Sequence, residues 1–143
     1  MTKKNTILVT GGSGFIGSNL VDLLINEGHS VIVIDDLSTG LSSNHNESAT
    51  YINEDLCRYI DHSEEIITIL QEHNIDTVYH LAASADVFLS INHPEMVYKI
   101  NVLASIALAQ ACKKAEVKKL VFASTSAVFG EPKYLPVDER HDT

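Results

Sequence analysis

The sequence predicts an α/β protein built on a parallel sheet with helices on both faces. Short apolar runs alternate with longer segments of helical periodicity, which is the pattern of strand–helix–strand units. A glycine-rich turn joins the first apolar run to the first helical segment. The 143 residues are 45% hydrophobic, which is enough for one domain with a substantial core.

The first strand and the first helix flank the glycine-rich turn. The run TILVT at residues 6–10 is the kind of apolar segment that a buried parallel strand needs. Beyond the turn, leucine and isoleucine recur at helical spacing until Gly28 supplies a stop. We therefore expect a helix over residues 14–27.

The remaining elements alternate in the same way. We expect strands at 31–35, 50–53, 77–80 and 119–123, and helices at 64–73 and 94–115. Asp61 stands three residues before Glu64, which suggests a capping box for the middle helix. Asn92 and Pro94 are suitable cap and first-turn residues for the long helix. Right-handed crossovers then give the strand order 3-2-1-4-5.

Two segments are expected to lack regular structure. Residues 36–46, DLSTGLSSNHN, are polar and rich in turn formers, which is typical of a loop. From Glu131 onward the chain is polar and acidic and contains two prolines. We therefore expect a single domain over residues 1–143 whose sheet ends at its fifth strand.

The long helix carries more apolar surface than one sheet can cover. Its main stripe consists of Val97, Ile100, Ala104, Ala107 and Ala111, and further apolar residues lie partly off this stripe: Met96, Leu103, Ile106 and Leu108. Two explanations stay open. Either another segment of the same chain buries the second face, which we favour, or the face is a subunit interface.

Charge and cysteine content limit the partners of the chain. A formal net charge of −9 argues against a nucleic-acid partner. Cys57 and Cys112 are not at CxxC spacing, which indicates reduced, buried thiols and a cytoplasmic location. The start of the chain leaves no room for a signal peptide, and no apolar run approaches membrane-spanning length. The seven histidines are scattered without metal-ligand spacing, so we expect no metal site.

The glycine-rich turn predicts a nucleotide site. Gly11, Gly14 and Gly17 lie where backbone N–H groups and a helix dipole favour an anion. In this pattern the first glycine allows a tight turn, the second lets the backbone approach a pyrophosphate, and the third lets the helix pack closely. Asp35 ends the second strand 18 residues after Gly17, where a carboxylate can bind ribose hydroxyls. NAD is favoured over NADP, because Asp35 would repel a 2′-phosphate and no Arg or Lys lies between it and Asn46.

Several motifs follow in order along the chain: TGGSGFIG at 10–17, VIVIDDLSTG at 31–40, Asp55–Leu56, HLAA at 80–83, Asn101 and VFASTSAVFG at 121–130. Together they resemble the extended short-chain dehydrogenase/reductase family, in its nucleotide-sugar epimerase/dehydratase branch. The resemblance implies a doubly wound parallel sheet of the Rossmann type. It also implies NAD as cofactor, a UDP-sugar as substrate and a homodimer.

The same resemblance implies roles for individual residues. Backbone amides of Phe15 and Ile16 would face the pyrophosphate. Other residues would line the adenine side: Asp36, Leu37, Ser38, Thr39, Gly40, Asp55 and Leu56. The rest of the cofactor-binding set would lie nearer the nicotinamide: Leu81, Ala82, Ala83, Asn101, Ala123 and Ser124. Thr125 would be the catalytic hydroxyl that hydrogen-bonds the reacting sugar hydroxyl.

Simple structural roles compete with three of these assignments. Asp55 can cap a turn, Asn101 can be a helix-surface amide, and Thr125 can bond the local backbone at a strand end. Tyr134 lies in a proline-flanked loop, where we expect a packing role and no part in acid–base chemistry.

The chain departs from the family in one respect that concerns catalysis. The resemblance implies a tyrosine followed four residues later by lysine, with the phenolate acting as base. No tyrosine of this chain has lysine at that distance: Tyr51, Tyr59, Tyr79, Tyr98 and Tyr134. We expect the pair to fall beyond Thr143, so that the chain is the cofactor-binding part of a longer enzyme and inactive alone.

The sequence is compatible with more than one function. Ser126 and Ala127 stand where family members that dehydrate or decarboxylate the sugar carry acidic residues, so a UDP-glucose 4-epimerase-like reaction is favoured. A dehydratase or decarboxylase of the same family is the first alternative, and an NAD-sensing regulator without catalysis is the second. A flavin or mononucleotide protein is disfavoured by HLAA and STSAVFG.

Overall fold

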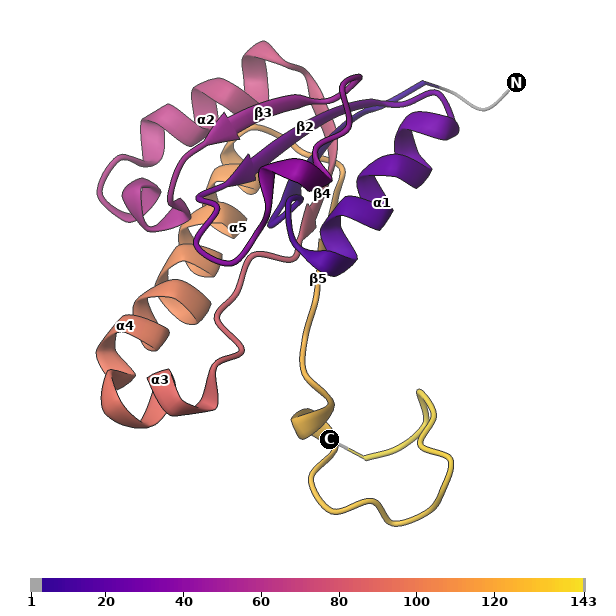
Figure 1. Ribbon diagram of the computed structural model, residues 1–143, viewed down its shortest axis with the longest axis vertical. Helices are drawn as coiled ribbons and strands as arrows, with labels where there is room; N and C mark the ends of the chain where they lie inside the picture. Colours follow the sequence, from indigo (N-terminus) through magenta and orange to yellow (C-terminus); the bar gives the residue numbers. More distant parts are fainter. Residues whose placement is uncertain (1–3, 143) are drawn as a thin grey trace.

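Five strands form one parallel sheet in the computed structural model, which describes residues 4–142. β1 (Thr6–Thr10) is central. On one side lie β2 (Ser30–Asp35) and β3 (Thr50–Asn53), and on the other β4 (Ile75–His80) and β5 (Lys119–Phe122). The order β3-β2-β1-β4-β5 is the one predicted, and the Rossmann-type topology is confirmed (Figure 1).

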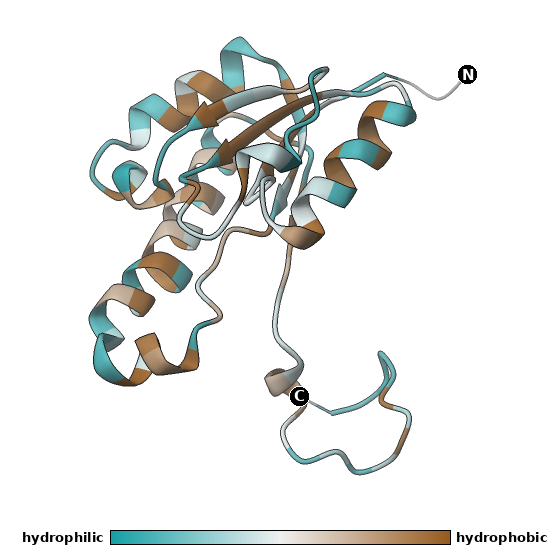
Figure 2. Ribbon diagram, viewed as in Figure 1, coloured by the Kyte–Doolittle hydropathy of each residue, from teal (hydrophilic) through white to brown (hydrophobic). Residues whose placement is uncertain are grey.

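Helices cover both faces of the sheet and divide its core in two. α1 (Phe15–Asn26) packs on one face over a cluster that includes Val9 and Val33. α2 (Ser63–Glu72) and α5 (Ala104–Lys114) pack on the other face over a larger cluster. Successive strand residues point to opposite faces, and helices cover both faces, so the central strands β1 and β2 are hydrophobic at nearly every position; β2 is brown in Figure 2.

The predicted long helix at 94–115 is confirmed as one continuous helical segment over residues 94–114, but it is not α-helical throughout. The structure has α4 (Pro94–Tyr98), a π-helical turn η3 (Lys99–Leu103) and then α5, which continue one another. A further helix, α3 (Val87–Asn92), precedes them and was not predicted. The Asp86 carboxylate accepts a hydrogen bond from the N–H of Leu89 and so caps α3.

The cap residues predicted for two helices are wrong, although both helices begin within one residue of the predicted positions. The N-cap of α2 is His62, which makes no side-chain cap, whereas Asp61 follows the 3₁₀ turn η2 (Leu56–Ile60) as its C-cap. Asn92 ends α3, and its side chain donates to the carbonyl of Phe88. Pro94 does occupy the first turn of α4, as expected.

The loop and tail segments agree with prediction apart from short 3₁₀ turns. Residues 36–46 form a loop that contains the turn η1 (Ser42–Asn44). After β5 the chain runs away from the sheet, makes the turn η4 (Ser126–Phe129) there, and has no further helix or strand through residue 142 (Figure 1). β5 is left at the edge with Phe122 55% exposed.

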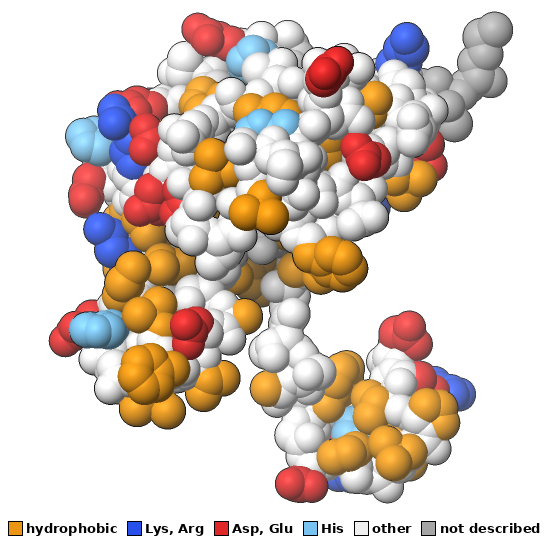
Figure 3. Space-filling model, viewed as in Figure 1, with side chains coloured by type: hydrophobic (Ala, Val, Ile, Leu, Met, Phe, Trp, Pro, Cys, Tyr) orange, Lys and Arg blue, Asp and Glu red, His pale blue; other side chains and the backbone are white. Residues whose placement is uncertain are grey.

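Apolar side chains gather on the helices that extend beyond the sheet (Figure 3). α5 is buried at Ala104, Ala107, Leu108 and Ala111. By contrast, large apolar residues of α3, α4, η3 and the start of α5 are exposed: Val87, Phe88, Ile91, Met96, Val102 and Ile106. Within residues 4–142 nothing covers this second face, so both explanations for it stay open.

Candidate functional site

A cavity of about 380 Å³ opens at the carboxyl ends of the strands. This is the end of a doubly wound sheet where ligands bind, beside the point at which the strand order reverses between β1 and β4. Most predicted cofactor residues line it: Gly11, Gly14, Asp35, Asp36, Ser38, Thr39, Gly40, Asp55, Leu56, Leu81, Ala82 and Ala83.

The glycine-rich turn is shaped by backbone contacts. Gly11 has φ +72°, and a Cβ there would lie 2.7 Å from the backbone nitrogen of Ala82. Gly14 precedes α1 without a side-chain cap, and the first turn of α1 holds no acidic residue. The N–H groups at this helix start therefore have neither a capping side chain nor a competing carboxylate. Phe15 and Ile16 supply two of them, while their side chains are 86% and 69% exposed.

The carboxylate of Asp35 is held in place at the edge of the cavity. Its Oδ2 accepts from the N–H of Ser13 at 2.9 Å, and its Oδ1 accepts from the N–H of Leu37 at 2.9 Å. Each oxygen has a second lone pair, so the group can still accept hydrogen bonds from a ligand hydroxyl. The acidic residue at the end of β2 thus meets the glycine-rich turn, as the motif predicts.

Ser13 joins the glycine-rich turn to the loop after β2, a role that sequence reasoning missed. Its carbonyl accepts from the N–H of Leu41 and from Nδ2 of Asn44. Its hydroxyl lies 3.1 Å from Nε2 of His45, whose ring stacks on Tyr51 at 3.7 Å between centroids. Ser13 is fully buried. The loop that lines the predicted adenine side is therefore fixed from several directions.

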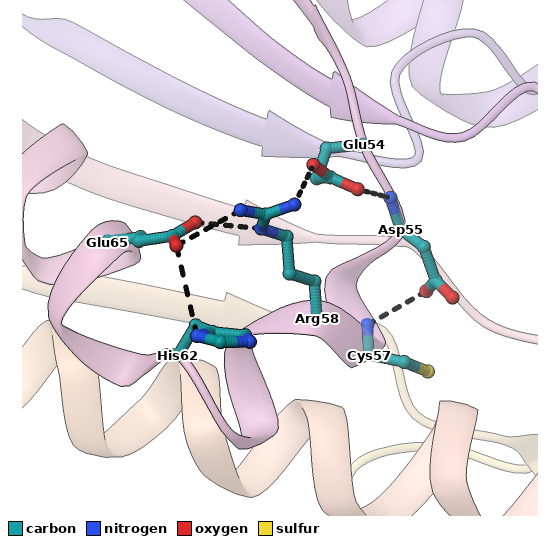
Figure 4. Close-up of polar contacts among 6 residues, drawn as sticks. All are labelled: Glu54, Asp55, Cys57, Arg58, His62 and Glu65. Carbon is teal, nitrogen blue, oxygen red and sulfur yellow. Dashed lines mark hydrogen bonds and ion pairs between the residues drawn. The ribbon is translucent and has the colours of Figure 1, made fainter.

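The turn after β3 is braced by a polar network (Figure 4). Arg58 bonds both carboxylate oxygens of Glu65, at 2.8 and 3.1 Å, and approaches Glu54 at 3.4 Å. Hydrogen bonding to Glu65 raises the pKa of Arg58, and the same pair lowers the pKa of Glu65. These charges are solvent-exposed, so the network organises the turn more than it stabilises the fold.

Asp55 and Cys57 of this turn both line the cavity. Oδ1 of Asp55 accepts from the N–H of Cys57 at 2.8 Å, so Asp55 does cap a turn while it also lines the cavity. Burial raises the pKa of the Cys57 thiol to about 11, and Asp55 adds to the effect. The thiol is therefore protonated at neutral pH. Cys57 and Cys112 are both buried and free, as predicted.

Asn101 ties the loop after β4 to the helical segment beyond it. Its Oδ1 accepts from the N–H of Ser84 at 2.8 Å, and its Nδ2 donates to the carbonyl of Ser84 at 2.9 Å. Asn101 lies in the π-helical turn η3 and does not line the cavity itself. It is thus neither a plain surface amide nor a direct wall of the cavity.

Several predicted site residues lie outside the cavity wall. The side chains of Phe15 and Ile16 and the residues Gly17 and Leu37 are not part of the wall, and Asn101 acts through Ser84. Ala123, Ser124 and Thr125 follow β5 and are exposed. Oγ1 of Thr125 accepts from the N–H of Ala127 at 3.2 Å, which is the local backbone role left open above. Tyr134 donates to Asp138 and packs on His141, with no contact to the cavity.

Sequence reasoning also missed one wall of the cavity. This wall comes from the helices after β4: Asp86, Leu89, Met96, Ile100 and Ala104. Asp86 was detectable as a capping residue before an apolar run, whereas the others have no signal beyond helical periodicity. Among residues 4–142 no helix could cross a membrane, and no three or more His, Cys, Asp or Glu are grouped to hold a metal ion.

The parallel sheet, the glycine-rich turn and the fixed acidic residue after β2 are the features of Rossmann-class dinucleotide-binding proteins. The chain belongs to the NAD-dependent epimerase/dehydratase family, whose model matches residues 7–143. The family resemblance seen in the motifs is thereby confirmed.

Known relatives place the chain within this family. The UDP-glucose 4-epimerase of Halalkalibacterium halodurans is 38% identical over 137 residues, 96% of this chain and 40% of the relative. The Thermotoga maritima UDP-glucose 4-epimerase, solved with UDP-glucose, is 39% identical with a TM-score of 0.86 over 96% of this chain and 44% of its own. The Brucella ovis enzyme, solved with NAD, is 32% identical with a TM-score of 0.86 over 96% of this chain and 41% of its own. The chain thus spans about two fifths of these relatives.

Proposed function

We propose that this chain is the NAD-binding part of a nucleotide-sugar epimerase that acts on a UDP-sugar such as UDP-glucose. One observation carries the proposal. The glycine-rich turn, the Asp35 carboxylate and the small residues Ala82 and Ala83 meet at one cavity at the carboxyl end of the sheet. Each matches the chemistry of one part of the dinucleotide.

Chain residues fit the successive parts of NAD. The N–H groups at the start of α1 suit the pyrophosphate, and Asp35 suits the adenosine ribose. Ala82 and Ala83 leave room for close approach by the nicotinamide ribose. When bound, NAD supplies a reversible hydride acceptor for oxidation of the sugar 4-hydroxyl. Thr125 would position that hydroxyl once the segment after β5 is held against the sheet.

The cofactor preference gives the first prediction. We expect the wild-type chain to bind NAD about 100-fold more tightly than NADP, because the 2′-phosphate would meet the Asp35 carboxylate. Asp35→Asn removes the charge but keeps the shape and one acceptor oxygen, and it should narrow the gap to about tenfold. Asp35→Ala should narrow the difference in affinity between NAD and NADP equally. It should also loosen the loop after β2, because it removes the acceptors of the Ser13 and Leu37 N–H groups. Calorimetric titration of both cofactors measures this, and tighter NADP binding by the wild type would refute it.

The reaction gives the second prediction. Dehydration needs an acid for the leaving hydroxyl and a base for the neighbouring C–H, whereas Ser126 and Ala127 offer neither. A protein that carries these residues together with the Tyr–Lys pair should interconvert UDP-glucose and UDP-galactose.

Products are analysed by NMR after separate incubation with UDP-glucose, UDP-glucuronate and dTDP-glucose. A 4-keto-6-deoxy sugar or released carbon dioxide would favour the dehydratase or decarboxylase instead. The 143-residue chain is the matched control: it should bind NAD and show no turnover, because it has no Tyr–Lys pair. NAD binding without turnover by the protein that carries the pair would favour a sensor.

Assembly and location complete the proposal. The proposal includes a homodimer, and the apolar face of α3, α4 and η3, with Phe88 and Ile91 76% and 72% exposed, is available for its interface where no further segment of the protein covers it. A cytoplasmic location is supported by the free, buried thiols of Cys57 and Cys112.

A further inference from the structure

A buried chain of polar side chains connects β1, β4 and α5 beside the cavity. Thr10 and His80 are 0% and 2% exposed. Oγ1 of Thr10 lies 2.7 Å from Nδ1 of His80, and Nε2 of His80 lies 2.8 Å from Oγ of Ser105. None of the three residues lines the cavity.

Both ends of this chain reach the backbone of segments that shape the site. The N–H of Ala82 donates to Oγ1 of Thr10 at 3.3 Å, and Ala82 is a wall of the cavity. The hydroxyl of Ser105 donates to the carbonyl of Asn101 at 2.8 Å. The Asn101 side chain in turn holds both backbone groups of Ser84. The loop after β4 is therefore tied at Ala82 and again at Ser84.

The directions of these hydrogen bonds define the state of His80. The Ser105 hydroxyl gives its proton to a carbonyl, so its oxygen accepts from His80, and Nε2 must carry hydrogen. A neutral imidazole carries a single N–H, so Nδ1 is then bare and accepts from the hydroxyl of Thr10, whose oxygen also accepts from the N–H of Ala82. Every donor then has one acceptor. Burial also lowers the pKa of His80 to about 4, which keeps the ring neutral.

We propose that His80, as the neutral Nε2–H tautomer, is a positioning residue for the NAD site. Its rigid ring sets the spacing between the cavity loop 81–84 and the π-helical turn η3. Moving either segment would leave a buried donor or acceptor unpaired, which is costly away from water. A π-helical turn is rare and is frequently found at functional sites. This proposal rests on the proposed cofactor site but concerns residues that would not touch NAD.

A double-mutant cycle tests whether Thr10 and Ser105 act through His80. Thr10→Val and Ser105→Ala each remove one hydroxyl and should each weaken NAD binding about tenfold by calorimetry. Because either change breaks the same set of hydrogen bonds through His80, the affinity of the double variant for NAD should also fall about tenfold. Thr68→Val is the matched control. Like the Ser105 hydroxyl, the Thr68 hydroxyl donates to the carbonyl four residues earlier, but it has no histidine partner. It should leave NAD affinity unchanged. A 100-fold loss in the double variant, or unchanged affinity in Ser105→Ala, would overturn the proposal.

A second readout needs no cofactor. ¹⁵N NMR of the His80 ring should show a proton on Nε2, and Ser105→Ala should shift the amide signals of Ala82 and Ser84. A proton on Nδ1, or unmoved amides, would also overturn the proposal. If the wild-type chain binds no NAD, the proposed function fails, and these NMR signals alone then decide whether His80 positions the loop.

Discussion

Replacing Gly17 by alanine should destabilise the fold severely, whereas replacing Gly14 should leave it almost intact. A Cβ on Gly17 would lie 2.1 Å from the carbonyl oxygen of Gly11 and 2.7 Å from Cα of Gly12. Both are backbone atoms of the turn, so α1 would have to move away from β1. We expect Gly17→Ala to lower the free energy of unfolding by at least about 3 kcal/mol.

Gly14 differs because its backbone is ordinary. Its φ is −77°, and an added Cβ would meet one atom at 3.4 Å. Gly14→Ala should therefore change the free energy of unfolding by less than about 1 kcal/mol. Since Gly14 lines the cavity, the new methyl group should keep a pyrophosphate from the helix start and weaken NAD binding about 100-fold.

Urea unfolding and calorimetric titration of the two variants separate these effects. Each variant is the control for the other, because the same methyl group is added three residues apart. Equal unfolding midpoints for the two variants would show that the close approach at Gly17 does not limit the fold. Wild-type NAD affinity in Gly14→Ala would remove the glycine-rich turn from the proposed site.

The topology and the first half of the site could be predicted because their signals are local. A buried parallel strand appears in the sequence as an apolar run, so the segment TILVT predicts β1. The order of the strands in the sheet follows from the right-handedness of the crossovers. The contact between Asp35 and Ser13 follows from the same logic, because the carboxyl ends of β1 and β2 are neighbours. These features need no knowledge of distant residues.

The second half of the site depends on contacts that the sequence pattern does not encode. The π-helical turn η3 keeps the apolar periodicity of its neighbours, so the change from α- to π-helical geometry within the long helix had no signal. α3 has six residues, too few for a helical period to stand out from a loop. Thr125 follows β5 on an exposed segment and bonds its local backbone, so its place relative to the cavity could not be derived from the sequence.

The most distant contacts were the least predictable. His80 meets Thr10 and Ser105 across 70 and 25 residues, and nothing in the composition of HLAA marks that histidine as buried and paired. Family resemblance assigned the two alanines of this motif to the cofactor and left the histidine unexplained. The structure supplies the reason for its burial: both ring nitrogens have partners.

The burial of His80 should make the protein sensitive to acid. The unfolded chain binds a proton at His80 near pH 6.5, whereas the folded chain does so only near pH 4, because burial penalises the charged ring. Between these values the unfolded state holds more protons, so the free energy of unfolding falls as pH falls. The contribution of His80 is fully present above about pH 6.5 and lost at about pH 4. It amounts to about 3 kcal/mol over that window.

Urea unfolding at several pH values between 4 and 7 measures this dependence. His80→Gln keeps an amide donor toward Ser105 but cannot take up a proton, so its unfolding free energy should vary less with pH by about the amount above. His73→Gln is the control, because it makes the same substitution at an exposed position at the end of α2 and so reports the effect of the histidine-to-glutamine change itself. Identical pH profiles for the wild type and His80→Gln would mean that His80 gains a proton in the folded state as readily as in the unfolded one. The buried chain from Thr10 to Ser105 would then have to tolerate a charged ring, contrary to the direction of its hydrogen bonds.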